Sequence, residues 1–330
     1  MNCASTTPVD QSNLDALLTN ALAGDRRALA KLLTVVEDGG AEYRYLSSKL
    51  FAASKGTHTI GLTGAPGAGK STLTDALVGE VRNSGNRVAV VAVDPSSPFT
   101  GGAILGDRVR LREEHASADD VFVRSLASRR QLGGLSLAVP GMISALDAAG
   151  WPVVLVETVG VGQSEVAIAG SADTTVVVVN PGWGDEVQAN KAGLIEIADI
   201  FVVNKSDRDG AGATVRDLER MLHLGAARDW NPPIVKTIAT DGTGVDELWK
   251  QIRNHFEYLE TSGELNQRRA ERRLNEMRER IQSLLEHELA MLESAVGKTV
   301  VDGVVSGAVD PTSGGVEMVA LLVARLNEQR

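Results

Sequence analysis

The sequence predicts an α/β protein with a doubly wound, mostly parallel sheet, and two observations support this fold class. Short apolar runs, most of them continuous and rich in β-branched residues, recur along the chain, and helical patterns separate them. The runs are Thr59–Leu62, Val88–Val93, Val153–Val156, Thr175–Val179, Ile200–Val203 and Ile234–Val235. Strands that are apolar on both faces are typical of a parallel sheet that helices cover on both sides. We expect this domain to span residues 57–258.

The chain before this domain, residues 1–56, is predicted to be a tail followed by a helical extension. Leucines recur at helical spacing within residues 13–54, around Leu14 and Leu18 and again around Leu29 and Leu33. The opening MNCASTTPVDQSN contains no basic region and no apolar region, so we do not expect a secretory signal. We therefore expect amphipathic helices that pack on the main domain.

The chain after this domain, residues 259–330, is predicted to be a helical arm. Apolar residues recur at helical spacing among dense charges over residues 264–294, which indicates one long amphipathic helix with a solvated face. Glycines mark a break after it, and a final helix is expected after Pro311 and Gly314-Gly315. An arm of this kind leaves an apolar side to be covered, so we expect it to form a homodimer.

Composition excludes several classes of partner and compartment. The formal net charge of −10 argues against a nucleic acid or an anionic membrane as partner, because both are polyanions. A single cysteine, Cys3, cannot form a disulfide within one chain, which fits a reducing cytosol and a cytoplasmic protein. No apolar run is long enough to span a membrane.

The first apolar run leads into a glycine-rich loop that fits the phosphate-binding pattern G-x-x-x-x-G-K-[ST]. The loop and the start of the next helix comprise Gly64, Ala65, Pro66, Gly67, Ala68, Gly69, Lys70, Ser71 and Thr72. Glycines allow the backbone N–H groups to point at phosphates, and the following helix adds its positive N-terminal end. We expect Lys70 to reach the β- and γ-phosphates and the Ser71 hydroxyl to bind Mg²⁺. The position between a strand and a helix argues against an accidental match.

Three acidic residues are candidate metal and catalytic groups. Asp94 ends the second apolar run, Glu157 ends the third, and Asp107 lies in a loop between them. Ligands bind beyond the carboxyl ends of parallel strands, where these side chains are expected. Mg²⁺ takes one or two carboxylates and keeps several waters, so not all three need bind it directly. As solvated loop acids or helix caps they would have no such role.

The segment that begins at Glu157 indicates a nucleotide-dependent switch. Glu157-x-x-Gly160 is comparable to the D-x-x-G of small GTPases, with glutamate in place of aspartate. The longer glutamate side chain is still expected to reach a metal-bound water. The N–H of Gly160 can contact the γ-phosphate, so the loss of that phosphate would release the loop. No glutamine directly follows Gly160, and Gln163 comes three residues later. The group that positions the attacking water is therefore left open, and slow unassisted hydrolysis is expected.

A second motif predicts that the base is guanine. Asn204-Lys205-Ser206-Asp207 follows the fifth apolar run and fits N-K-x-D. The carboxylate of Asp207 can accept from both N1–H and N2–H₂ of guanine, whereas adenine offers no such donor pair. Asn204 is expected to brace the loop, and the stem of Lys205 to lie along the base. The backbone N–H of Ala239 is a further candidate contact with the base.

With these motifs the sequence resembles the methylmalonyl-CoA mutase-associated GTPases of the MeaB, ArgK and MMAA type. The resemblance covers roughly residues 15–330. It depends on GAPGAGKST (64–72), VDPSSPFTGGAILGDRVRL (93–111), SRRQLGG (128–134), VETVGVGQSE (156–165), PGWGDEVQ (181–188) and IADIFVVNKSD (197–207). It implies a P-loop GTPase that binds GTP or GDP with Mg²⁺ and dimerises. It also implies a chaperone that gates cofactor loading onto adenosylcobalamin-dependent methylmalonyl-CoA mutase and protects that enzyme.

Three other functions are alternatives to this one. Metal-delivery GTPases for nickel or zinc carry cysteine and histidine clusters, but here Cys3 is alone and the histidines are scattered. A kinase linked to arginine or ornithine transport is disfavoured by the guanine motif. A binding module without hydrolysis is disfavoured because Lys70, Ser71 and Glu157 are all present.

Overall fold

The computed structural model describes residues 10–95, 111–128, 134–158, 170–182, 193, 196–224, 229–294 and 296–328. The chain divides into two compact units, residues 1–272 and 273–330. The division into a helical extension (1–56), a central domain (57–258) and a helical arm (259–330) stays a prediction.

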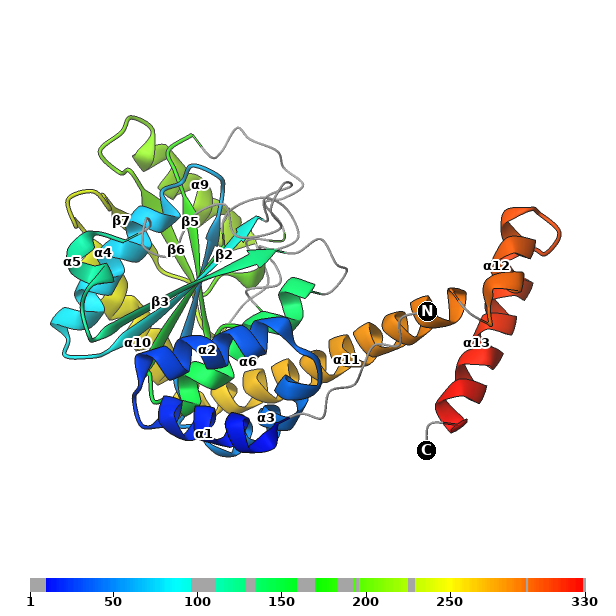
Figure 1. The fold of residues 1–330 in the computed structure, drawn as a ribbon. Coiled ribbons are helices and arrows are strands. Elements are labelled where there is room, and N and C mark those ends of the chain that lie inside the picture. The colour runs from blue at the N-terminus through cyan, green and yellow to red at the C-terminus, as the bar shows by residue number, and fades with distance from the viewer. Residues whose placement is uncertain are drawn as a thin grey trace. The chain divides into compact units, whose positions relative to one another are not determined.

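A seven-stranded parallel sheet forms the centre of the first unit, with strand order β3-β2-β4-β1-β5-β6-β7 (Figure 1). Its strands are β1 (His58–Gly64), β2 (Val88–Pro95), β3 (Val121–Ser128), β4 (Val153–Thr158), β5 (Thr174–Val179), β6 (Ile200–Asn204) and β7 (Ile234–Thr237). The order of β1 and its neighbours shows that the chain winds in both directions from the centre. This confirms the predicted doubly wound α/β fold.

Helices cover both faces of this sheet. They are α1 (Gln11–Leu22), α2 (Arg26–Asp38), α3 (Gly40–Ala52), α4 (Lys70–Asn83), α5 (Glu113–Ala116), α6 (Gly134–Ala148), α9 (Ala211–Leu224) and α10 (Val245–Ser262). Successive strand residues point to opposite faces. Val88 and Val90 of β2 therefore pack in a core with α4 and α10, while Ala89 and Val91 pack in a core with α2 and α6. This two-sided burial is why the strands are continuously apolar.

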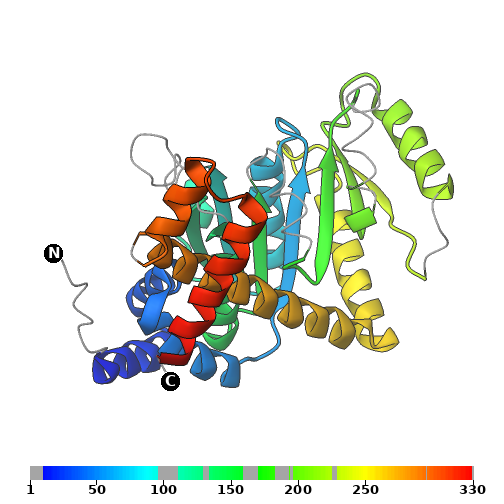
Figure 2. The same cartoon turned by 90° about the vertical axis from the view of Figure 1, so that its right-hand side faces the viewer.

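The N-terminal helices complete the core that contains α6, as Figures 1 and 2 show for the blue helices beside the green α6. Leu32, Leu33 and Leu46 are fully buried. The side chain of Asp25 caps α2 by accepting from two backbone N–H groups. The predicted helical character of residues 13–54 is confirmed.

Strand β3 is absent from the strands that the sequence predicts. Within the described part of the chain it lies at the edge of the sheet beside β2, and it carries Arg124 and Ser125 in its middle. Arg124 forms an ion pair with Glu37 of α2, with 2.8 Å between Nη2 and Oε2. Arg124 interrupts the apolar pattern because it faces α2, one of the N-terminal helices, and the pattern alone does not indicate this.

The second unit is helical. It contains the later part of α11 (Glu264–Glu293), then α12 (Lys298–Val305) and α13 (Pro311–Glu328), around a small core of Leu292, Val300 and Met318. The predicted long helix over residues 264–294 is confirmed, but α12 was not predicted. The final helix begins at Pro311, so the expectation that it starts after Gly314-Gly315 is wrong. Asp310 caps this helix by accepting from the backbone N–H groups of Thr312 and Ser313.

Among the described residues, no helix combines the length and the apolar character that crossing a membrane would require.

Candidate nucleotide-binding site

The glycine-rich loop joins the end of β1 to the start of α4, at the carboxyl edge of the sheet. Gly64 has a φ of +134°, and a Cβ there would lie 1.9 Å from the carbonyl oxygen of Val178 on β5. Gly69 has a φ of +89°, and a Cβ there would lie 2.5 Å from Nδ2 of Asn204. Both positions need glycine, because the backbone conformation and the neighbouring atoms leave no room for a side chain.

Lys70 is held inside this loop. Its side chain is buried, and Nζ donates to the carbonyl oxygens of Gly64 at 2.5 Å and Ala65 at 3.1 Å. The ammonium group therefore lies over the same backbone whose N–H groups are expected to bind phosphates. This position suits a positive charge that compensates the β- and γ-phosphates.

Ser71 and Glu157 are brought together by the sheet. Ser71 is the second residue of α4, and Glu157 lies on β4 opposite Leu62 of β1. The Ser71 hydroxyl donates to Oε1 of Glu157. Both groups offer oxygen donors, and Glu157 is almost fully buried. A hydroxyl and one carboxylate side by side are a donor set that suits Mg²⁺.

The other predicted metal and switch residues are only partly described. The backbone of Asp94 lies in β2, next to the strand that carries Glu157, but its side chain is outside the described part. Asp107 and Gly160 lie outside the described residues altogether. Within the described residues there is no group of three or more His, Cys, Asp or Glu side chains that could hold a metal ion.

Asn204 joins the phosphate loop to the predicted base loop. Its Nδ2 donates to the carbonyl oxygen of Ala68 at 2.8 Å. Its Oδ1 accepts from the hydroxyl of Thr237 and the backbone N–H of Ala239, both at 3.1 Å. These three hydrogen bonds would allow Asn204 to brace the loop as predicted. The predicted contact between Ala239 and the base would have to share the N–H that Asn204 already uses.

Thr237 is a site residue that sequence reasoning missed. It is fully buried at the end of β7, where its hydroxyl holds Asn204 and its carbonyl oxygen accepts from the N–H of Ser206 at 3.1 Å. The only available signal is its place two residues before Ala239, and threonine is common in strands.

Lys205 and Asp207 complete the base loop. Lys205 has a φ of +57°, the only positive φ of a non-glycine residue in the described part of the chain. Its Nζ donates to the carbonyl oxygen of Gly67 at 2.6 Å, so the stem crosses the phosphate loop. Asp207 is exposed, so its carboxylate is accessible to a base. The strained backbone of Lys205 is consistent with a functional loop, where such strain is concentrated.

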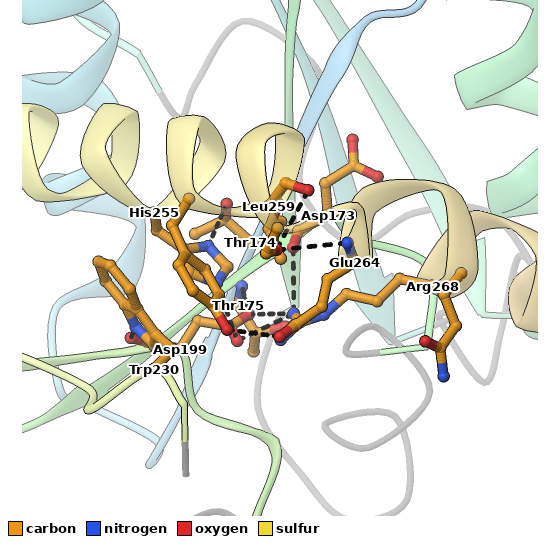
Figure 3. A network of polar contacts seen from close by, with 12 residues as sticks. Asp173, Thr174, Thr175, Asp199, Trp230, His255, Leu259, Glu264 and Arg268 are labelled. Carbon is orange, nitrogen blue, oxygen red and sulfur yellow. Dashed lines mark hydrogen bonds and ion pairs between the residues drawn. The ribbon is translucent and has the colours of Figure 1, made fainter.

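A second polar cluster lies at the opposite, N-terminal edge of the sheet (Figure 3). The hydroxyl oxygen of Thr174 lies 2.9 Å from Nε2 of His58 and 2.9 Å from Nδ1 of His255. Nε2 of His255 faces Asp199, 3.3 Å from Oδ1. A hydroxyl has one proton, so it donates to one ring and accepts from the other. A proton on Nε2 of His255, facing the carboxylate, makes Nδ1 the acceptor and His58 the donor.

Arginines at the start of α11 neutralise two buried aspartates in this cluster. Burial disfavours the charge of Asp173, but the hydrogen bond from Arg269 and the charge of Arg272 outweigh it and lower the pKa. Burial likewise opposes the charge of Asp199, and the contacts of His255 and Arg268 hold its pKa below the usual value. The cluster joins α10 and α11 to the base of the sheet. Its place, far from the carboxyl ends of the strands, excludes it from the nucleotide site.

Comparison with known proteins agrees with this arrangement. A family model described as "Methylmalonyl Co-A mutase-associated GTPase MeaB" matches residues 29–294. A protein of Pyrococcus horikoshii that is named as a GTPase is 49% identical over 276 residues, which cover 82% of this chain and 86% of that protein. The "Methylmalonic aciduria type A homolog, mitochondrial" of Mus musculus is 35% identical over 280 residues, or 79% of this chain and 67% of that protein.

One solved structure resembles nearly the whole chain. The crystal structure titled "LAO/AO transport system kinase" matches with a TM-score of 0.71 and 29% sequence identity. The match covers 95% of this chain and 99% of the other.

Proposed function

The chain belongs to the family of methylmalonyl-CoA mutase-associated GTPases, and we propose that it is the GTP-driven chaperone of an adenosylcobalamin-dependent methylmalonyl-CoA mutase. It is a GTP hydrolase of the P-loop type. The proposed cycle gates the loading of the cofactor and protects the mutase. The family description and the name of the mouse relative support this choice of partner.

The observation that supports nucleotide binding most strongly is the hydrogen bonding of Asn204. Its side chain connects Ala68 of the phosphate loop with Ala239 of the base loop, so both halves of a nucleotide pocket are held in register. In this pocket Lys70 would neutralise the phosphates, and the backbone of residues 64–69 would bind them. Asp207 would select guanine.

Mg²⁺ is the proposed cofactor. Ser71 and Glu157 would hold it, with Asp94 and Asp107 as further candidates and Gly160 as the contact with the γ-phosphate. When bound, the ion would neutralise charge that develops on the phosphate oxygens. The hydrogen bond from the Ser71 hydroxyl to the Glu157 carboxylate supports this assignment, because the two proposed ligands already lie next to each other.

Hydrolysis is proposed to depend on the partner. No glutamine directly follows Gly160, where small GTPases carry the residue that orients the attacking water, so that group is not identified in this chain. A partner that supplies or orders such a group would accelerate turnover, which would couple hydrolysis to the binding of the mutase.

The second unit is proposed to form the interface of a homodimer. Large apolar side chains are exposed along α11 at Leu274, Met277, Ile281, Leu284 and Met291. Spacings of three and four residues place most of them on one stripe, as in helices that pair with another helix. A second copy offers the same stripe and can bury both. On this proposal residues 259–330 are the dimerisation arm and residues 57–258 the GTPase domain, in a cytoplasmic protein.

The chaperone proposal can be tested with purified mutase. We expect the mutase to bind the protein in light scattering, to raise the rate of GTP hydrolysis, and to load adenosylcobalamin at a rate that depends on the nucleotide. The variant Lys70→Ala, which should not bind nucleotide, controls for effects of protein alone. A mutase that forms no complex and leaves the hydrolysis rate unchanged would contradict the proposal. Transfer of the γ-phosphate to arginine or ornithine in the same assay would favour a kinase instead.

A further inference from the structure

Five large apolar side chains on α11 repeat at a spacing that favours pairing with another helix. Their positions advance alternately by three and four residues, with Glu288 in the place of a sixth. The five are Leu274, Met277, Ile281, Leu284 and Met291, each between 43% and 54% exposed. A repeat with a mean spacing of about 3.5 residues keeps one apolar seam along a helix and is typical of two helices that pack along their length. This set is called the α11 stripe below.

The other helices of the second unit cover a different side of α11. Leu292 forms a small core with Val300 of α12 and Met318 of α13. The α11 stripe stays exposed beside this core. Glu288, which interrupts the stripe, already has a partner in Arg325 of α13, with 3.0 Å between Oε2 and Nε. The stripe therefore needs an occupant other than α12 and α13 of the same copy, and its one charge does not have to be buried unpaired.

Charge is distributed unevenly along the part of α11 that carries the stripe. Residues 273–280 contain three arginines and two glutamates, whereas residues 281–293 contain three glutamates and neither lysine nor arginine. A second copy of this helix in parallel orientation would place the two acidic halves side by side. An antiparallel copy would place each acidic half beside the half that holds the arginines. Charges that flank an apolar seam select the orientation of paired helices, because like charges in contact disfavour the wrong one.

The order of residues in the stripe also suits an antiparallel copy. A copy centred between Ile281 and Leu284 pairs stripe positions that are equally far from the centre. These pairs are Ile281 with Leu284, Leu274 with Met291, and Met277 with Glu288. Each pair occurs twice in a dimer with twofold symmetry, because the same patch of both copies forms the contact. Only the levels that contain Glu288 are not apolar on both sides.

We infer that α11 pairs with α11 of a second copy in antiparallel orientation, with Ile281 opposite Leu284 at the centre of the contact. The inference rests on the proposed homodimer, to which it adds the orientation and the register. Seventeen positions separate Leu274 from Met291. In the antiparallel pair the two copies of Leu274 therefore lie about 25 Å apart along the helix axis, whereas Leu274 of one copy lies beside Met291 of the other.

Cross-linking measures this orientation directly. Cys3→Ser removes the single native cysteine and gives a background without thiols. Leu274→Cys and Met291→Cys are then placed in separate, differently tagged copies of the full chain, which are co-expressed so that mixed dimers form. A short bismaleimide reagent links thiols that lie close together, and gel electrophoresis separates linked dimers from monomers. Asn275→Cys with Ala290→Cys is the matched control, because both residues are exposed at nearly the same levels but point away from the stripe.

We expect the mixture of Leu274→Cys and Met291→Cys to shift to the dimer band, while each variant alone and the control pair stay at the monomer band. Cross-linking of Leu274→Cys with itself would show parallel pairing and overturn the inference. Cross-linking of Met277→Cys with Val319→Cys in separate copies, in place of the expected pair, would show that α13 of the other copy covers the stripe and would overturn it as well.

A spin label outside the stripe tests the same orientation if the cysteines in the stripe weaken the dimer. Two labels on Asn275→Cys, one in each copy, should lie at least about 22 Å apart in an antiparallel pair, and a much shorter distance would contradict the inference. Light scattering of the wild type separates this outcome from a failure of the proposed function. A wild type that is a monomer would refute the proposed homodimer itself, whereas a dimer in which none of these pairs reacts would overturn only the antiparallel contact.

Discussion

The guanidinium of Arg269 donates two hydrogen bonds to the carboxylate of Asp173, at 3.1 Å from Nε and 2.8 Å from Nη2. Asp173 is fully buried, so removing the partner leaves a buried charge with less compensation. Breaking such a pair typically costs about 3–5 kcal/mol. We expect Arg269→Gln to lower the free energy of unfolding by an amount near the lower limit, measured by urea denaturation. Arg220→Gln, which breaks an exposed pair with Asp217, should change it little.

His58 should make the protein sensitive to mild acid. Burial lowers its pKa from 6.5 to about 3, so the folded state binds fewer protons than the unfolded state between these values. Stability therefore rises with pH across this window and is lost as the pH falls below about 6.5. The slope is up to about 1.4 kcal/mol per pH unit, or about 2 kcal/mol between pH 7 and pH 5.

The check on this prediction is a variant that cannot titrate. His58→Gln keeps a donor for the hydroxyl of Thr174 but has no proton to gain, so its free energy of unfolding should vary less between pH 7 and pH 5. Denaturant titrations at both pH values measure the difference. If the wild type and His58→Gln show the same pH dependence, the titration of another group is responsible.

Gly64 and Gly67 give a matched pair for the backbone of the phosphate loop. Both have a positive φ, but a Cβ on Gly64 would lie 1.9 Å from the carbonyl oxygen of Val178, while nothing lies within 4 Å of one on Gly67. Alanine should therefore strain the backbone at both positions. Only at position 64 should its Cβ also push strand β1 away from strand β5. We expect Gly64→Ala to melt well below Gly67→Ala in the absence of nucleotide, measured by calorimetry. Equal melting temperatures would mean that the strands shift without cost.

The parts of the fold that the sequence predicts are those whose signal is local. The phosphate loop is one continuous segment, and the buried strands are continuous apolar runs, so neither needs knowledge of distant residues. The contacts that the sequence does not reveal join distant residues of common types. Thr237 reaches Asn204, and Asp75 reaches His115 across forty positions. The edge strand with Arg124 is likewise understandable only with Glu37 beside it.

Lys70→Ala should abolish tight binding of GTP and GDP and leave the fold intact. The ammonium group lies at the phosphate loop, 2.5 Å from the carbonyl oxygen of Gly64, and is expected to compensate the β- and γ-phosphates directly. Lys250→Ala removes an exposed lysine of α10 and should bind as the wild type does. Calorimetric titration with each nucleotide makes the comparison. A folded Lys70→Ala protein with unchanged affinity would remove the support for this phosphate site.

Base choice depends on Asp207, whose exposed carboxylate follows the strained backbone of Lys205. The carboxylate should accept from N1–H and N2–H₂ of guanine. In Asp207→Asn an amide donor meets one of these donors. A lost partner in a polar site costs about 1–3 kcal/mol, and more when the lost group is charged. That corresponds to a loss of GTP affinity of about tenfold to a hundredfold or more.

The same substitution should open the site to another base, which separates loss of recognition from loss of structure. Xanthine carries a carbonyl oxygen where guanine carries N2–H₂, and the asparagine amide can donate to it. We expect Asp207→Asn to gain affinity for xanthosine triphosphate and to keep its Mg²⁺ dependence, while the wild type prefers GTP to ATP strongly. Asp209→Asn removes the same charge two residues along the loop and should leave base choice unchanged. Competition binding of GTP, ATP and xanthosine triphosphate to the three proteins decides the matter, since a wild type that accepts ATP equally would show that Asp207 does not select the base.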